Sequence, residues 1–487
     1  MRVRLAHLAL ASSALALSAC AVGPNFHKPA PPTVSAYTPA PLPAATMSAP
    51  GPGGASQGFV AGMDVAGDWQ TLFQSPALTA LVAQAVKANP DLAAAKAALR
   101  GAHETYLAQR GAFFPSVGVD YNVARQKATD TLAPPLSDNN NLFTLHTLTL
   151  TVAYTPDVFG GIRRQVENAA AQAEDQKWQT EAAYLTLTSS VVSGAIQAAA
   201  LGDEIRATQR VITLGREALA IVKRQKAEGQ AAGLDVAAQE SAVAQAEATL
   251  PPLRKQLAIQ QDQLAQLTGR FPSEVHDAPM DLASLTLPAD LPESLPSKLV
   301  AQRPDILAAS ANLHAASAEV GVAIAARLPA FTVTGQAGGA STLFSTLLNG
   351  QNSFYSIAGD VAQPIFQGGA LYHRQKAAEA TLDQAKQQYR STVLSAFQNV
   401  ADCLQALDSD GAALAAAARA EGAAKTTLDI TRRQEQAGQV AGLAVMLAEQ
   451  TYEQALITRI QSQSARYADT VALYQALGGG WWNRKDL

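Results

Sequence analysis

The sequence RQKAEGQAAGLDVAAQESAVAQ at residues 224–245 returns as RQEQAGQVAGLAVMLAEQTYEQ at residues 433–454, a shift of 433 − 224 = 209 positions. Earlier in the chain, Asn89-Pro90-Asp91-Leu92 returns as Arg303-Pro304-Asp305-Ile306, a shift of 304 − 90 = 214. Because the matches are collinear, the chain contains two copies of one unit of about 210 residues. Helical solenoids repeat every 20–50 residues, so this is a different architecture.

Apolar residues recur at helical spacing over most of each unit, beginning near Trp69. The pattern predicts helices over residues 76–112, 160–228, 234–267, 368–437 and 443–477. A helix of about 65 residues would extend about 100 Å. Their small and aliphatic interiors favour long antiparallel pairs of the coiled-coil kind, which turn at Gly229 and Gly438. Beyond the first twenty residues we expect no 18-residue apolar helix.

Four stretches instead alternate with a period of two. In the first, Val117, Val119 and Tyr121 alternate with small and polar residues. The predicted strands are residues 116–126, 143–155, 330–340 and 353–364. Such strands are typical of an outer-membrane barrel, with lipid on one side and water on the other. A soluble antiparallel sheet with one buried face alternates in the same way, so the strands alone leave both interpretations open.

Four strands are too few to close a barrel, and open strand edges are not tolerated in lipid. If the strands cross a membrane, several chains must therefore share one barrel. Two chains would give eight strands around an interior filled by side chains, and three would give twelve strands around a water-filled passage. The residues alone do not choose between these assemblies.

The amino terminus is that of an exported protein. Arg2 and Arg4 precede an apolar run of about 13 residues, too short to span a bilayer. Leu17-Ser18-Ala19-Cys20 resembles the lipobox of bacterial lipoproteins, which predicts a signal peptide at residues 1–19 and N-acyl and S-diacylglycerol groups on Cys20. An ordinary signal cleavage beside an incidental cysteine is the alternative. By the same resemblance, Ala21 favours sorting to the outer membrane.

Composition and residue spacing exclude several function classes. A net charge of −4 over 487 residues provides no basic surface for nucleic acid. Cys20 and Cys403 cannot form a disulfide framework, and we expect Cys403 to be a small buried side chain. The seven histidines lack metal-ligand spacing, and Gly478-Gly479-Gly480 follows a helix instead of opening one. We therefore predict no metal, no cofactor, no nucleic-acid partner and no catalytic residue, hence no enzyme.

Further motifs carry a family resemblance. Gly23-Pro24-Asn25-Phe26, Pro156-Asp157-Val158-Phe159-Gly160, Gln363-Pro364-Ile365-Phe366 and the closing stretch from Leu473 to Trp481 resemble those of TolC-type outer-membrane factors. The similarity is to the lipoprotein branch, which serves efflux pumps of the resistance-nodulation-division class, and it spans Cys20 to Trp481.

This resemblance implies a mainly α fold with membrane β-strands. It implies a homotrimer whose 12-stranded barrel continues into a long periplasmic barrel of α-helices. The chain would be the exit duct through which drugs or other small molecules leave, with outer-membrane lipid, a periplasmic adaptor and an inner-membrane pump as partners. The expected organisation is a lipidated linker at residues 20–65, efflux repeats at 66–296 and 297–478, and a tail at 479–487.

The resemblance also implies two functional regions at the helix ends. The candidate gate is Asp429 with Arg432, spaced i, i+3 shortly before Gly438; a solvated surface pair is the alternative. The candidate adaptor-docking tips could equally be ordinary turns, and they are Gly229, Leu234, Asp235, Gly438 and Leu443. Ala444 stands where the first tip has Asp235, so the second tip lacks that carboxylate.

Two other function classes remain open at this stage. The same channel could serve protein secretion, which a neighbouring secretion ATPase gene would indicate. A helical lipoprotein could instead be an envelope scaffold, which would show neither conductance nor a heat-resistant trimer. The residues do not identify an exported substrate, because ducts of this kind leave selection mainly to the pump.

Overall fold

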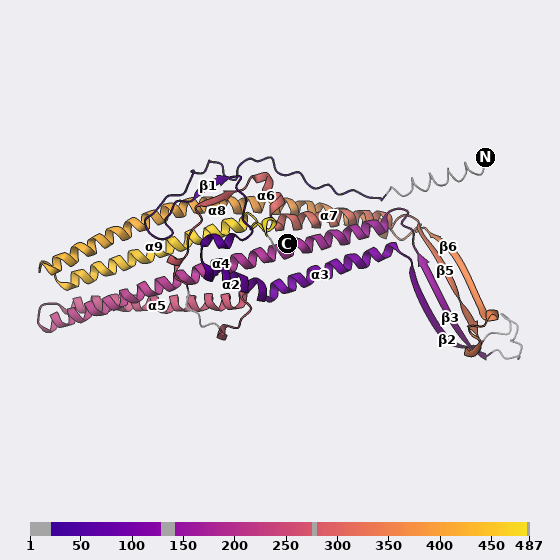
Figure 1. Ribbon diagram of the computed structural model, residues 1–487, viewed down its shortest axis with the longest axis horizontal. Helices are drawn as coiled ribbons and strands as arrows, with labels where there is room; N and C mark the ends of the chain where they lie inside the picture. Colours follow the sequence, from indigo (N-terminus) through magenta and orange to yellow (C-terminus); the bar gives the residue numbers. More distant parts are fainter. Residues whose placement is uncertain (1–20, 128–141, 275–279, 485–487) are drawn as a thin grey trace. The chain divides into compact units, whose positions relative to one another are not determined.

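The computed structural model describes residues 21–127, 142–274 and 280–484 (Figure 1). The candidate lipidation residue Cys20 lies outside the described residues. The chain is mainly helical and divides into two compact units. The first unit comprises the described parts of Met1–Pro29, Leu99–Gln176 and Ala309–Tyr389, and the second those of Ala30–Ala98, Lys177–Ala308 and Arg390–Leu487.

A four-stranded antiparallel sheet lies in the first unit, with the strand order β2-β3-β5-β6. Its strands are β2 (Ser116–Lys127), β3 (Leu142–Tyr154), β5 (Ala330–Ser341) and β6 (Ser353–Ala362). All four agree with the predicted strands to within two residues. The start of β2 pairs with the end of β3, and the start of β5 with the end of β6. The sheet therefore meets its flanking helices at one end.

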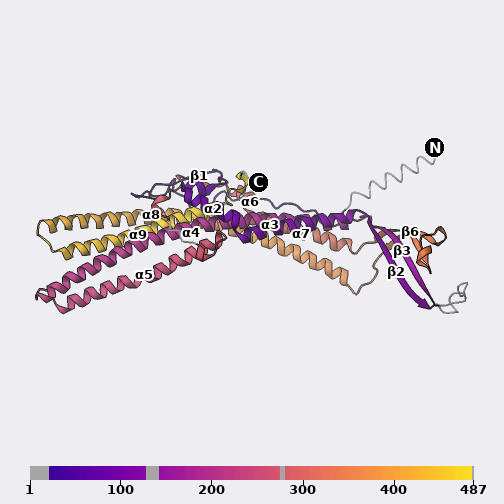
Figure 2. The ribbon, with the colours of Figure 1, turned by 60° about the horizontal axis from the view of Figure 1, so that its bottom comes forward.

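Two long helical hairpins dominate the second unit, and both views place α5 beside α4 and α9 beside α8 (Figures 1 and 2). The helices are α4 (Gly161–Ala227), α5 (Gly233–Leu267), α8 (Ala370–Gln436) and α9 (Gly442–Ala476). Their bounds confirm the predicted helices to within two residues. The first turns of α4 and α8 belong to the first unit, and both helices continue into the second.

The helix predicted over residues 76–112 is wrong in one respect. It is two helices, α2 (Pro76–Ala88) and α3 (Pro90–Arg110), separated by Asn89. Asn89 is extended, as a residue before proline prefers to be, and its Oδ1 accepts a hydrogen bond of 2.9 Å from the Leu92 amide. The second repeat has the same break between α6 (Pro296–Gln302) and α7 (Pro304–Ala325).

The predicted linker at residues 20–65 includes regular structure and specific contacts. Residues 58–61 form strand β1 (Gly58–Ala61), which pairs in parallel with β4 (Asp290–Glu293). Residues 44–57, here called the strap, pack against α9. There Arg466, which is fully buried, donates hydrogen bonds to Thr46 Oγ1 at 2.7 Å and Gln57 Oε1 at 3.1 Å, and to the carbonyls of Gly53 and Ala55.

The expectation of no 18-residue apolar helix needs correction too. Helix α4 contains such a window, so by length and composition it could cross a membrane, but 72% of the window is buried inside the protein, as in a core helix. The buried core of the second unit includes Trp69, Phe73, Tyr467 and Tyr474. Short 3-10 turns complete the described fold: η1 (Trp69–Phe73), η2 (Gly111–Phe113), η3 (Pro272–Glu274), η4 (Leu282–Ser284), η5 (Phe344–Thr346), η6 (Gly350–Asn352) and η7 (Trp481–Asn483).

Candidate functional site

One face of the four-stranded sheet is apolar from edge to edge. Val119 lies opposite Leu150, Leu150 opposite Ala337, and Ala337 opposite Tyr355, so the apolar positions of all four strands share one register. Large side chains on this face are exposed at both edges, on β2 and on β6. An apolar face that its own chain leaves open is a surface for lipid or for another protein.

The opposite face of the sheet is lined by hydroxyl, amide and carboxylate groups. Thr149 lies opposite Asp120, Thr151 opposite Gln336, and Thr332 opposite Asp360. The strands β2 and β6 are the two ends of the strand order, so each leaves one backbone edge without a partner strand in the described chain. A sheet with one apolar face, one polar face and two open edges is incomplete as a single copy.

The tips of the two helical hairpins have the same backbone geometry. Gly229 and Gly438 have φ values of 76° and 71°, a left-handed conformation that favours glycine. In both tips the residue after the glycine donates to the carbonyl five positions earlier at 2.8 Å, which closes the helix end. The predicted turns are thus confirmed, and they place Leu234, whose side chain is 78% exposed, in the first turn of α5.

Asp235 has a local structural partner. Its Oδ2 accepts a hydrogen bond of 2.9 Å from the Ala232 amide and so caps the start of α5. In the second hairpin Ala444 occupies this position, and Ala441 has no side-chain cap. Leu443 is half-buried there. The two tips therefore share a backbone and differ in charge and exposed apolar surface.

The candidate gate residues Asp429 and Arg432 both lie on α8. Arg432 forms its ion pair with Glu449 of α9 instead of with Asp429. Within the described residues no ion pair is recorded for Asp429. Both side chains line one cavity of about 390 Å³, together with Lys425, Leu428 and Tyr452 of their own hairpin, and Arg210, Thr213 and Leu214 of α4.

A second ion pair near this cavity joins the two hairpins, and sequence reasoning missed it. Arg210 of α4 donates to Glu453 Oε1 of α9 at 2.7 Å. This hydrogen bond raises the pKa of Arg210 above its ordinary value. Glu453 is buried, so loss of Arg210 would leave a buried carboxylate without its cation. Arg210 and Glu453 are 243 residues apart, so the local spacing of the sequence could not predict this ion pair.

Residues 22–26, which follow the predicted lipidation site, are held by a buried arginine. Arg164 Nε donates to the Val22 carbonyl at 3.0 Å and Nη2 to Asn25 Oδ1 at 2.8 Å. Arg164 also pairs with Glu167, and although burial opposes the change, hydrogen bonds from His314 and Arg164 lower the pKa of that carboxyl. The His314 ring in turn stacks on Phe26 at 4.4 Å. We call these contacts the N-terminal clamp.

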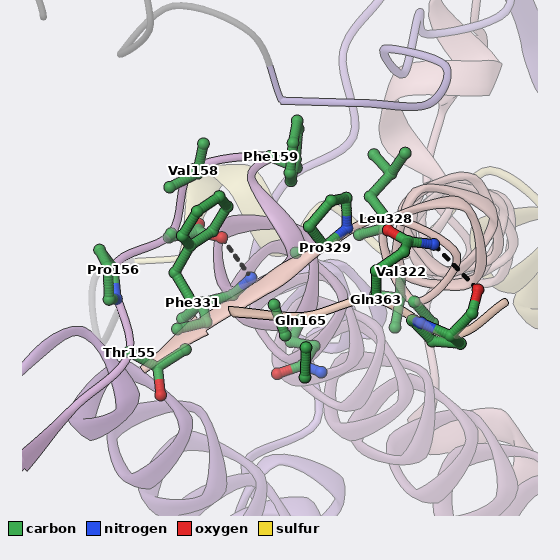
Figure 3. Close-up of a pocket in the computed structure, with 18 of the residues that line it drawn as sticks. Thr155, Pro156, Val158, Phe159, Gln165, Val322, Leu328, Pro329, Phe331 and Gln363 are labelled. Atoms are coloured by element: carbon green, nitrogen blue, oxygen red, sulfur yellow. Dashed lines mark hydrogen bonds between the residues drawn. The ribbon is translucent and has the colours of Figure 1, made fainter. Parts of the chain in front are cut away.

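A cavity of about 630 Å³ lies where β3 and β5 meet the helices (Figure 3). Its lining includes Val158 and Phe159 in the turn after β3, Leu328 just before β5, and Phe331 of β5. The Phe159 and Phe331 rings are 6.4 Å apart. This junction joins the two sequence repeats within one chain.

Other candidate chemistry is sparse in the described residues. They contain no group of three histidine, cysteine or acidic residues that could hold a metal ion. Cys403 is half-buried instead of fully buried, and burial raises the pKa of its thiol to about 11.

Comparison with known proteins decides the family. The model of the outer membrane efflux protein family matches residues 81–270 and 295–479. The chain belongs to this family. Membership confirms the predicted family resemblance, the location in the outer membrane and the role in efflux.

Relatives of this efflux protein match along nearly their whole length. The pyoverdine export outer membrane protein OpmQ of Pseudomonas putida is 29% identical over 85% of this chain and 88% of its own. The toluene efflux pump outer membrane protein TtgI of the same species is 27% identical over 96% of this chain and 97% of its own.

Solved structures have the same fold. The outer-membrane channel OprN is 25% identical and superposes with a TM-score of 0.80, covering 95% of this chain and all of its own. The CmeC outer membrane channel of Campylobacter jejuni superposes with a TM-score of 0.83 at 19% identity, covering 95% of each chain.

Proposed function

We propose that three copies of this efflux protein form one channel, whose wall of twelve membrane strands continues into a tunnel of periplasmic helices. The observation that carries the proposal is the sheet, which is apolar on one face, polar on the other, and open at β2 and β6. Lipid would cover the apolar face, and closure between copies would pair the edges. An envelope scaffold has no need of this arrangement.

Strand number favours three copies over two. Eight strands enclose a space that side chains fill, whereas twelve leave room for water and solute. Thr149, Thr151 and Thr332 would then line the passage with hydroxyls, beside the carboxylates of Asp120 and Asp360 on the same face.

The test is reconstitution of the purified, acylated protein in planar bilayers, together with electrophoresis of unheated samples. We expect a trimer that dissociates only on heating and discrete conductance steps. A monomeric protein without conductance would refute the channel. In cells, deletion of the gene should lower resistance to some drugs or solvents, and the intact gene should restore it.

We further propose that the channel works with a periplasmic adaptor and an inner-membrane pump of the resistance-nodulation-division class. The exposed tips support docking, since Leu234 offers apolar surface beside the glycine turn. Leu234→Asp should abolish drug resistance while the heat-resistant trimer persists. Ile259→Asp, which changes another exposed aliphatic residue of α5, is the matched control and should leave resistance intact.

For the gate, we propose that Arg432, Glu449 and Asp429 act together. The Arg432–Glu449 pair ties α8 to α9 beside Asp429, and the Arg210–Glu453 pair ties α9 to α4. Arg432→Ala and Asp429→Ala should both raise the open probability in bilayers. Arg216→Ala, which breaks an exposed pair between α4 and α5, is the control. Unchanged conductance in both gate variants would show a plain surface pair worth about 0–1 kcal/mol.

We also propose that Cys20 carries the lipid anchor. Two acyl-bearing groups would give lasting attachment where one chain gives only reversible binding. Cys20→Ser should abolish labelling by radioactive palmitate.

The relatives named for pyoverdine export and toluene efflux suggest small organic molecules as cargo, with the pump selecting among them.

A further inference from the structure

The end of β6 carries two apolar side chains that nothing in their own chain covers. Ile365 is 89% and Phe366 87% exposed, in the turn that leads from β6 to α8. At the opposite edge of the sheet, Phe114 is 71% exposed two residues before β2 begins. Both groups lie at the end of the sheet that meets the helices.

These two groups cannot meet within one chain. Strands β2 and β6 are separated by β3 and β5, so three interstrand spacings, about 14 Å in all, lie between the edges. If β6 of one copy pairs with β2 of the next, that separation falls to a single spacing of about 4.8 Å. Because the sheet is antiparallel, the end of β6 would then lie beside the start of the neighbouring β2.

The chain contains a template for this junction. At the β3–β5 junction, the turn after β3 and the segment before β5 line one apolar cavity, and they include Val158 and Leu328. By the shifts of 208 and 214 residues that relate the repeats, Val158 corresponds to Phe366 and Leu328 to Phe114. Leu328 is half-buried in its own chain, whereas Phe114 is exposed.

The same comparison shows that Ile365 replaces a useful polar residue. In the first repeat Asp157 occupies this position, and its carboxylate accepts hydrogen bonds from the Ile162 amide at 3.0 Å and the Arg163 amide at 2.8 Å, which caps α4. Isoleucine cannot cap α8. An exposed isoleucine in place of a helix-capping aspartate indicates a contact outside the chain.

We propose that Ile365 and Phe366 of one copy pack against Phe114 of the next copy, forming an apolar clasp at each seam between copies. The clasp rests on the proposed trimer and deepens it. It locks the seam at the level where strands pass into helices, and the occupant of the exposed patch is a second copy of this chain.

Cross-linking tests the contact directly. The acylated protein carrying both Phe114→Cys and Phe366→Cys, treated with a short bis-maleimide, should yield covalent dimers and trimers. Co-expression of the two single variants should yield covalent dimers, and each single variant alone should yield none. Native Cys403 is replaced by alanine throughout. Cross-linking confined to monomers, or none in an intact trimer, would overturn the clasp.

A substitution copied from the first repeat distinguishes loss of the clasp from loss of folding. Ile365→Asp restores the carboxylate that caps α4 at the matching position, so the chain should fold, but its trimer should lose heat resistance. Phe271→Asp changes another exposed aromatic residue, in the second unit, and should leave the trimer unaffected. A heat-resistant trimer of the Ile365→Asp variant would refute the clasp. A nitroxide attached to the Phe366→Cys variant gives a second measurement. If lipid-soluble oxygen reaches this nitroxide, lipid and not a second copy covers the patch.

These outcomes are distinct from failure of the proposed channel. If the unmodified protein forms no trimer and conducts no current, the proposed function itself fails. If it conducts as a trimer while the cysteine pair stays unlinked, only the clasp fails.

Discussion

Replacement of Arg466 by alanine should release the strap from the second unit. The guanidinium is fully buried and binds the strap at four acceptors. Thr46 Oγ1 keeps a second donor, the backbone amide of Gln57, and the other two acceptors are carbonyls of residues that are half-buried (Gly53) and exposed (Ala55). Gln57 Oε1 is the acceptor that remains buried without a donor.

The expected free-energy cost follows from this single unpaired acceptor. One buried acceptor left without a donor costs about 1–3 kcal/mol, so we take about 2 kcal/mol for opening of the strap. Since 1.4 kcal/mol is a factor of ten in an equilibrium constant, the open population should rise roughly 30-fold. When closing is fast relative to cleavage, the rate of proteolysis rises by the same factor.

The assay is limited digestion of the trimer with proteinase K, with fragments assigned by mass spectrometry. Cleavage within residues 44–57 should accelerate in Arg466→Ala and less so in Arg466→Lys, which keeps the charge and fewer hydrogen bonds. Arg216→Ala removes an exposed pair and should leave strap cleavage unchanged. A rise of less than about threefold, or an equal rise in the control, would refute the reasoning.

Three further predictions concern local stability, each measured by hydrogen exchange. Burial, and then the neighbouring Asp469, raise the pKa of Asp410 to about 7, so the folded state binds a proton more tightly than the unfolded state. Helix α8 near Asp410 should therefore lose protection from exchange as the pH rises from about 4 to about 7. The Asp410→Asn variant should not show this pH dependence. Asp235→Ala should destabilise the first turn of α5 by about 0.5–2 kcal/mol, so its amides should exchange faster. Ala444→Asp should slow exchange in the first turn of α9. Equal exchange before and after either change would contradict the capping role. Gly321→Ala would bring a Cβ within 2.7 Å of Arg164 Cγ, so the N-terminal clamp should be destabilised by about 1–3 kcal/mol. The Val22 amide, which donates to the Phe159 carbonyl, should then exchange faster. The control is Gly101→Ala, whose Cβ meets nothing within 4 Å.

The long elements were predictable because their signals are local and repeated. Strand alternation around Val117 and helical spacing up to Gly229 extend over many residues, and the second repeat supplies an independent copy of each. The break at Asn89 was also readable, since a residue before proline disfavours the helical conformation, but the apolar spacing on both sides concealed it.

The contacts of the functional regions were less predictable because they join distant segments. Arg432 has an acidic residue three positions before it, yet its ion pair is with Glu449 on the facing helix. The strap is rich in proline, glycine and alanine, a composition that favours an extended chain, and only the fold reveals that Arg466, more than 400 residues away, binds it.

The two repeats differ where the amino terminus meets the fold. In the first repeat the Val22 amide donates to the Phe159 carbonyl, and Gly160 leaves room for Ala21, so the chain's own N-terminal segment covers the turn after β3. The second repeat has no such segment, and its turn exposes Ile365 and Phe366. A duplicated unit with one N-terminus can cover only one of its two turns from within. The other turn must be covered from outside, and in a closed ring the neighbouring copy is adjacent to it at every seam.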